Sequence, residues 1–298
     1  MADDTNKGLT LALIGTLVIL PDTVLMRLSG LGPAQMVAWR GLLQAAMLIG
    51  LWLVLSRRKG PELSGSLTVT GLLAIALQAT NAGLFATGIA LAPVAVVLFA
   101  VATTPLVSAV LGALFLGDRL QPTTLAAAVL VLLGIGVSVS GEYGGTGSAW
   151  IGALCGGLVS VALAGSFTIY RARPDLSVML TVGSGAAISG AVGLSLAPSM
   201  FQTDGYLPAI WVTGLVILPV SFTTFGMASR YTVAANVSLV LLLETVLGPI
   251  AVWAVVGEPV GPRGLVGGAV VVVTLAVYLW DQRRRALRRR PQVSPVAG

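Results

Sequence analysis

A succession of ten apolar runs, each about long enough to cross a bilayer, constrains the fold of this chain more than any other feature. A spanning α-helix needs roughly 20 mostly apolar residues, and only short polar segments separate these runs. Only 9% of the 298 residues are charged, against about 25% in a soluble domain, so lipid must solvate most of the chain. We predict an all-α membrane protein with ten transmembrane helices over residues 9–27, 33–55, 67–90, 93–116, 122–140, 149–170, 176–197, 206–228, 232–256 and 262–281.

The residue types that carry much of protein catalysis and metal binding are scarce. The chain has no histidine and one cysteine, Cys155, which excludes Ser-His and Cys-His catalytic pairs and an intramolecular disulfide. It also has no GxxxxGK[ST] phosphate-binding loop. We therefore expect no enzyme, no cofactor and no metal, and any uphill work has to draw on ion or substrate gradients.

The basic residues indicate how the chain crosses the membrane. With the N-terminus in the cytoplasm, fourteen of the 17 Lys and Arg residues fall in cytoplasmic segments, as the positive-inside rule requires. The first apolar run has no small-residue cleavage site, so we expect a spanning helix rather than a signal peptide. The cytoplasmic basic residues are Lys7, Arg57, Arg58, Lys59, Arg119, Arg171, Arg173, Arg230 and the six arginines from Arg283 to Arg290.

The arginine-rich C-terminal segment and the overall composition suggest a location. We expect residues 283–298 to be a cytoplasmic tail that meets anionic lipid headgroups rather than nucleic acid. Arginine greatly outnumbers lysine, and Ala, Val and Gly abound, as coding bias in a high-GC bacterium would give. The expected location is a bacterial inner membrane, with both termini in the cytoplasm.

The chain contains a weak internal repeat at an offset of 140 residues. Residues 92–139 align with residues 232–279, and the acidic turn Gly117–Pro122 lies over Gly257–Pro262. Five spans per half is an odd number, so the second copy must enter the membrane upside down. We predict two inverted five-helix repeats, 1–145 and 146–282, followed by the basic tail. Such repeats place a substrate site near mid-membrane, and they are typical of secondary transporters.

The chain carries an ordered set of short motifs: Trp39-Arg40, Thr103-Thr104-Pro105-Leu106, Phe115–Leu120, Leu242-Leu243-Glu244 and Val256–Pro259. This set resembles the EamA-type drug/metabolite transporters over nearly the whole chain. The resemblance implies a ten-helix carrier of small metabolites, in many members an exporter, with helices one to four and six to nine around a central cavity. The chain departs from the family pattern at Pro21-Asp22, where tryptophan-glycine is common, and at Thr245, where proline is common.

Three ionisable residues fall inside spans, where each is a functional hypothesis by default. Glu244 lies near the middle of its span and shares a helix face with Asn236; it either binds a substrate amine or a proton, or bonds backbone freed by Pro249. Asp22 and Arg40 lie at similar depth. They either form a structural ion pair or snorkel toward headgroups, or Arg40 binds a substrate carboxylate. All three are candidates for ion pairing or coupling.

Uncharged polar and aromatic residues form two further stripes at helical spacing. Gln78, Asn81 and Phe85 share one helix face, and Phe99 and Thr103 share another. Each stripe is consistent with a cavity wall or with a helix interface held by amide hydrogen bonds. GxxxG pairs at Gly152/Gly156 and Gly264/Gly268 indicate close helix packing, in a monomer or a homodimer. The candidate substrate-binding residues are Gln78, Asn81, Phe85, Phe99, Thr103, Asn236 and Glu244.

These residues favour secondary transport of a small zwitterion. Phosphorylated substrates would need several buried Lys or Arg residues, and only Arg40 lies well inside a span, away from its ends. We predict export of neutral amino acids, including aromatic and large aliphatic ones, by alternating access through a mid-membrane cavity. The alternative is an exporter of lipophilic organic cations, because an acid among aromatic rings binds such ligands. A channel would instead show flux without saturation or counterflow.

Overall fold

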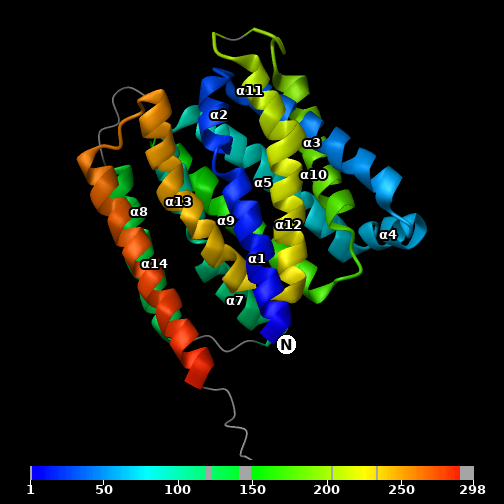
Figure 1. The fold of residues 1–298 in the computed structure, drawn as a ribbon. Coiled ribbons are helices and arrows are strands. Elements are labelled where there is room, and N and C mark those ends of the chain that lie inside the picture. Colours follow the sequence, from blue (N-terminus) through cyan, green and yellow to red (C-terminus); the bar gives the residue numbers. More distant parts are fainter. Residues whose placement is uncertain (1, 118–121, 141–148, 203, 233, 289–298) are drawn as a thin grey trace, which may run out of the picture.

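The computed structural model describes residues 2–117, 122–140, 149–202, 204–232 and 234–288, and the regular elements among them are all helical (Figure 1). The predicted all-α fold class is therefore confirmed. The helices are α1 (Ala2–Ile19), α2 (Asp22–Leu28), α3 (Pro33–Leu55), α4 (Lys59–Ser66), α5 (Val69–Leu91), α6 (Val94–Val101), α7 (Thr104–Leu116), α8 (Pro122–Val139), α9 (Ala149–Ala172), α10 (Val178–Leu196), α11 (Leu207–Val212), the π-helical turn η1 (Thr213–Ile217), α12 (Leu218–Tyr231), α13 (Ala234–Val256) and α14 (Pro262–Arg288).

Seven helical segments of the described chain are long and apolar enough to cross a bilayer. Three shorter apolar stretches lie within α8, α13 and α14. They are Val129–Val139, Val240–Val256 and Pro262–Tyr278. The count of ten spanning helices and the division into two inverted repeats stay predictions. The seven segments are Asn6–Leu28, Pro33–Leu55, Val69–Leu91, Val94–Leu116, Ala149–Ala172, Val178–Leu196 and Leu207–Tyr231.

Three of these segments are interrupted at or beside a proline. Pro21 separates α1 from α2, and Pro105 lies at the start of α7, just after α6 has ended. Pro219 follows η1 at the start of α12. Proline lacks the N–H that would continue the helical ladder, and its ring clashes with the preceding turn. Such breaks survive in membranes where neighbouring helices satisfy the freed backbone groups.

The most extensive helix pairs join the part of the chain before residue 140 to the part after residue 149. They are α3 with α10, α8 with α14, α5 with α9 and α1 with α12. Glycines bring α3 and α10 together, because a Cβ added at Gly41 would lie 2.6 Å from Gly190 Cα. Figure 1 shows α8 and α14 side by side along one flank.

The two predicted GxxxG pairs pack within the fold. A Cβ at Gly152 would lie 2.6 Å from Ala92 Cβ, and one at Gly156 would lie 2.5 Å from Val97 O, so this pair receives α6. Gly268 lies against the Phe99 ring, and Gly264 is buried. These glycines therefore serve helix packing inside one chain.

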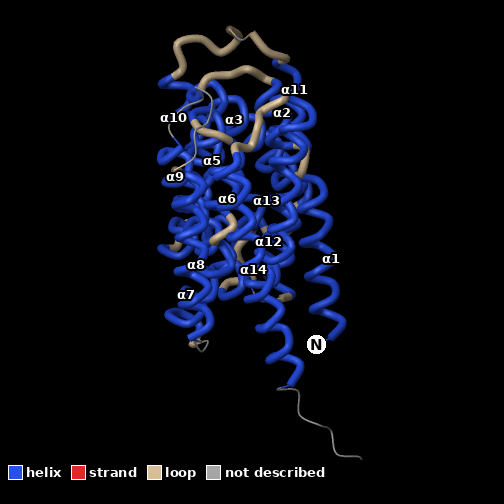
Figure 2. The backbone as a smooth tube through the Cα atoms, turned by 90° about the vertical axis from the view of Figure 1, so that its left-hand side faces the viewer, coloured by secondary structure: helices blue, strands red, loops and turns tan. Residues whose placement is uncertain are grey.

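The predicted outer loops meet at one end of the elongated bundle (Figure 2). Gln35 Nε2 donates to Ser199 O at 2.6 Å and to Gln202 O at 2.8 Å. Arg27 Nε lies 2.8 Å from Glu258 Oε2, and Glu258 Oε1 accepts from the backbone N–H that begins α6. Helix α1 begins, and α14 ends, at the other end of the bundle (Figure 1).

The predicted cytoplasmic loops also contact one another. Arg230 Nη2 donates to Leu176 O, and Lys7 lies over the Tyr231 ring, 4.4 Å from its centroid. Arg173 Nη2 donates to Asp175 Oδ2 at 2.7 Å. This hydrogen bond holds the pKa of Asp175 below its ordinary value and raises that of Arg173. The described contacts thus join the predicted outer loops to one another and the predicted cytoplasmic loops to one another.

Candidate substrate cavity

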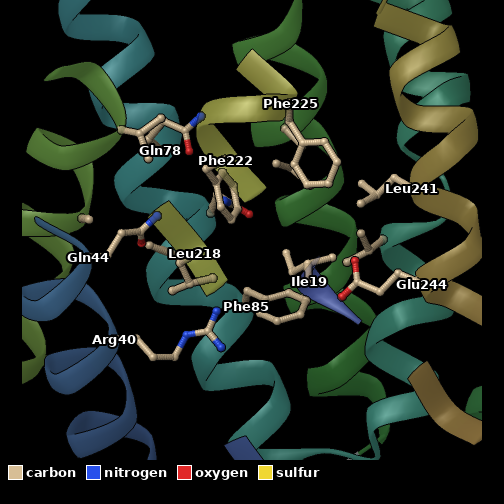
Figure 3. Close-up of a pocket in the computed structure, with 16 residues that line it drawn as sticks. Ile19, Arg40, Gln44, Gln78, Phe85, Leu218, Phe222, Phe225, Leu241 and Glu244 are labelled. Carbon is tan, nitrogen blue, oxygen red and sulfur yellow. The ribbon is translucent and has the colours of Figure 1, made fainter. Parts of the chain in front are cut away.

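A cavity with about 640 Å³ of space free of atoms lies among eight helices (Figure 3). The space in which the centre of a water molecule fits is about 40 Å³, so the side chains leave the cavity narrow. Both parts of the chain contribute lining residues, from α1, α3, α5 and α6 and from α9, α10, α12 and α13. The lining residues are Ile19, Arg40, Gln44, Gln78, Asn81, Ala82, Phe85, Val101, Leu163, Val182, Ala186, Leu218, Phe222, Phe225, Leu241 and Glu244.

Arg40 enters the cavity from α3 as half of a buried ion pair. Its Nη1 lies 2.9 Å from Asp22 Oδ2 and also contacts Met26 Sδ. Asp22 is fully buried, and Arg40 is 6% exposed. The Phe85 ring lies 5.5 Å from the Arg40 guanidinium carbon, within range of a cation–π interaction. The ion pair expected between Asp22 and Arg40 is present, and Arg40 lines the cavity at the same time.

Glu244 lies on the opposite wall, on α13, and its side chain is buried among apolar groups. The residue is 5% exposed, and its carboxylate interacts electrostatically with both Asp22 and Arg40. Its Oε1 has no hydrogen-bond partner. This oxygen is therefore not tied to the backbone that Pro249 frees, which was the structural alternative open from the sequence.

Amide side chains form the polar part of the remaining wall. Gln78 Nε2 lies 3.3 Å from the Tyr170 hydroxyl, which lies 3.0 Å from Thr181 Oγ1. Asn81 is one turn further along α5 and also lines the cavity. The α5 stripe thus serves both of its proposed roles, because Gln78 bonds α9 while facing the cavity.

Two of the predicted binding residues lie elsewhere. Phe99 packs against Gly268 and lines a separate groove between α13 and α14. Thr103 Oγ1 donates to Ala100 O at 2.7 Å and lies 2.8 Å from Ser160 Oγ. The prediction treated residues 93–116 as one helix, whereas the break between α6 and α7 changes which side chains face inward. The side chain of Asn236 lies outside the described part of the chain.

Several lining residues were missed from the sequence. Gln44 stands one turn after Arg40 on the same face of α3, and this spacing was available as a signal. Phe222 and Phe225 are three residues apart on α12, and their rings lie 6.3 Å apart. Ile19 and Leu218 end or begin helices at proline breaks, and apolar residues at such breaks carry no distinctive sequence signal.

Comparison with known proteins finds a family that part of the chain resembles and a solved structure with a similar fold. Residues 6–140 match the model of the EamA-like transporter family. A crystal structure of a protein 20% identical in sequence superposes with a TM-score of 0.63, covering 96% of this chain and 99% of that one, and at this identity the likeness shows the fold alone. Comparison with curated proteins gives no match. Over residues 6–140, somewhat less than half of its length, the chain is therefore similar to the EamA-like transporter family.

Proposed function

We propose that this transporter exports neutral amino acids, including aromatic and large aliphatic ones, by alternating access through the cavity. The observation that carries the proposal is the presence of one base and one acid on opposite walls. Arg40 enters from α3 and Glu244 from α13, with aromatic and aliphatic side chains between them (Figure 3). A zwitterion carries the complementary pair of charges.

The acid and the base each retain groups that a substrate can use. Arg40 has five N–H donors, and its two described side-chain contacts use Nη1 alone. The rest of the guanidinium suits a carboxylate, which accepts two parallel hydrogen bonds. The unpartnered Glu244 Oε1 suits an ammonium group. A neutral amino acid could thus pair its two charged groups with Arg40 and Glu244, which both line the cavity.

Apolar and aromatic groups dominate the rest of the lining and favour a large side chain. Phe85, Phe222 and Phe225 present ring surface to the cavity, and aromatic rings bury large apolar ligands well. Gln44, Gln78 and Asn81 add uncharged hydrogen-bonding groups. A few polar groups in an apolar wall are typical of small-molecule sites. Such a lining favours weak and broad selectivity, which a carrier needs in order to release its cargo.

A lipophilic organic cation is the second candidate. Glu244 pairs with no basic residue among the described salt bridges, and an acid in the same cavity as Phe222 and Phe225 can bind a delocalised cation. This reading leaves Arg40 to repel the cargo, since its guanidinium also lines the cavity. The zwitterion uses both charges, and we therefore place it first.

Counterflow in proteoliposomes tests the substrate class. Vesicles loaded with unlabelled phenylalanine or leucine should take up the labelled amino acid, with saturation and with competition among neutral amino acids. Empty vesicles and vesicles loaded with glutamate serve as controls. If a lipophilic cation exchanges and no amino acid does, the cargo is the cation and the amino-acid proposal is wrong. Flux that neither saturates nor shows counterflow would indicate a channel.

A further inference from the structure

Three buried oxygen atoms beside the cavity have no hydrogen-bond partner. They are Asp22 Oδ1, Thr23 Oγ1 and Glu244 Oε1. Asp22 and Thr23 are fully buried, and Glu244 is 5% exposed. An unsatisfied polar atom in such surroundings costs roughly 1–3 kcal/mol. Three of them at one place indicate a ligand that serves all three.

These oxygens gather where α2 packs against α13. A Cβ added at Gly248 would lie 3.7 Å from Thr23 Oγ1 and 4.0 Å from Glu244 Cγ, so the two side chains meet over the same glycine. Asp22 precedes Thr23 and interacts electrostatically with Glu244. The three side chains therefore lie near one another, and their unpartnered oxygens do not bond to one another.

The break between α1 and α2 adds backbone oxygens to this region. A helix leaves its last carbonyl groups without intrahelical donors, and α1 ends at Ile19 beside the cavity. Pro21 has no N–H to offer them. In transporters with interrupted helices, such carbonyl ends and half-helix C-termini coordinate coupling ions.

The charges around the site leave one negative unit unbalanced. With both acids ionised, Asp22 and Glu244 contribute two negative charges, and Arg40, which bonds Asp22 Oδ2, contributes one positive charge. Among the charged residues described on helices that pack against α13, Lys7 lies over Tyr231, Arg27 pairs with Glu258, and Arg230 bonds Leu176 O. A single monovalent cation between Asp22 and Glu244 would balance the remaining negative charge. Positive and negative groups would then alternate from Arg40 through Asp22 and the cation to Glu244.

We propose that Asp22, Thr23, Glu244 and the carbonyl end of α1 form a Na⁺-binding site. All the ligand atoms are oxygens, which hard cations prefer and softer transition metals do not. A monovalent ion neutralises the site, whereas a divalent ion would leave it positive. The site shares Glu244 with the proposed cargo, and it is otherwise built on the side of Asp22 that Arg40 does not contact.

Sharing Glu244 gives the site a role in transport. Na⁺ and the ammonium group of an amino acid both need this carboxylate, so binding of one excludes the other. Mutual exclusion is the condition for antiport, in which inward Na⁺ movement drives cargo outward. This coupling rests on the proposed function, whereas binding of Na⁺ to the resting protein does not.

Thermal unfolding of the purified full chain tests the site without any cargo. Unfolding is compared in NaCl, KCl and choline chloride at equal ionic strength and fixed pH. A ligand that binds only the folded state raises its stability, so the wild type should gain a few degrees in Na⁺, with saturation. Thr23→Val and Glu244→Gln should lose this gain. Thr16→Val is the matched control, because Thr16 Oγ1 is buried on α1 but bonds Ala12 O, and it should keep the gain.

Three outcomes would overturn the site. The first is a wild-type protein that Na⁺ stabilises no more than choline does. The second is a Na⁺ effect that persists in both Thr23→Val and Glu244→Gln, provided each unfolds in choline at the wild-type temperature and so is correctly folded. The third is stabilisation by acid in place of Na⁺, lost in Glu244→Gln, which assigns the oxygens to a proton. Stabilisation by Na⁺ without amino-acid counterflow would instead support the Na⁺ site and contradict the proposal that the substrate is an amino acid.

Discussion

At the scale of residues, burial of charge decides which contacts matter. The sequence places Asp22 and Arg40 at similar depth, and that estimate made an ion pair one of the alternatives for them. It could not show that Glu244 lies near the same pair, because helix spacing says nothing about which faces of distant helices meet. Nor could it identify Thr23, since a buried hydroxyl normally bonds its own helix, as Thr16 does. The site thus follows from partnerships that only the fold defines.

Removing one partner of the buried Asp22–Arg40 ion pair should reduce stability more than removing both partners. Asp22→Asn leaves Arg40 without its carboxylate, and a lone buried charge typically costs about 3–5 kcal/mol. We expect a large loss of stability in Asp22→Asn and in Arg40→Gln, and a double variant closer to wild type than the sum of the two. Unfolding in detergent measures all four proteins. Additive losses would mean that the two side chains do not stabilise each other.

Glu244→Gln should separate a transport role from a structural one. The amide keeps the size of the side chain but cannot hold an ammonium group by charge, so expression and thermal stability in choline should survive while amino-acid counterflow is lost. Asp204→Asn, an acid-to-amide change at an exposed loop position, is the control and should transport normally. Normal counterflow in Glu244→Gln would exclude its role in cargo binding.

At the scale of elements, the sequence predicted the apolar spans well and their interruptions poorly. Pro21 was visible within the first span, yet the second half of that span, α2, proved to be where the chain carries Asp22 and Thr23 into the interior. The break between α6 and α7 removed Thr103 from the predicted wall. Hydropathy reports the length of an apolar run, and it is insensitive to a change of direction inside the run.

Two glycines on α3, Gly41 and Gly50, test how closely α10 approaches this helix. Gly41→Ala places a methyl group 2.6 Å from Gly190 Cα, and overpacking of this kind costs about 1–3 kcal/mol. Gly50→Ala, on the same helix, meets nothing within 4 Å and should be neutral or slightly stabilising, because alanine is the better helix former. Thermal unfolding of both variants measures the difference. Equal stability would show that α10 does not lie against Gly41.

At the scale of the whole molecule, the charge pattern predicts an orientation that the fold can accommodate. The described contacts gather the arginine-rich loops together, through Arg230 and Leu176, and gather the loops with few basic residues separately, through Gln35 and Gln202. The positive-inside rule then assigns the arginine-rich loops to the cytoplasm. The internal offset of 140 residues predicts the relation between the two halves, but not which helices pair.

Cysteine accessibility tests this orientation. Gln202→Cys and Ser64→Cys lie at exposed positions on the two sets of loops. In intact cells an impermeant thiol reagent should label Gln202→Cys, and Ser64→Cys should react only after the membrane is opened. Native Cys155 is buried, and the unsubstituted protein measures its background. The reverse labelling pattern would place both termini outside and overturn the predicted topology.

The pairing of helices across the middle of the chain has a consequence for biosynthesis. Because α3, α5 and α8 pack mainly on α10, α9 and α14, the first half of the polypeptide leaves the ribosome well before its partners exist. Until those partner helices are made, the polar atoms that the folded protein buries face lipid or the insertion machinery. The interrupted α1–α2 segment, with its buried acid, is inserted first and receives α13 almost last. We therefore expect this segment to stay open to quality-control proteases for longer than a segment whose partners follow directly in the chain.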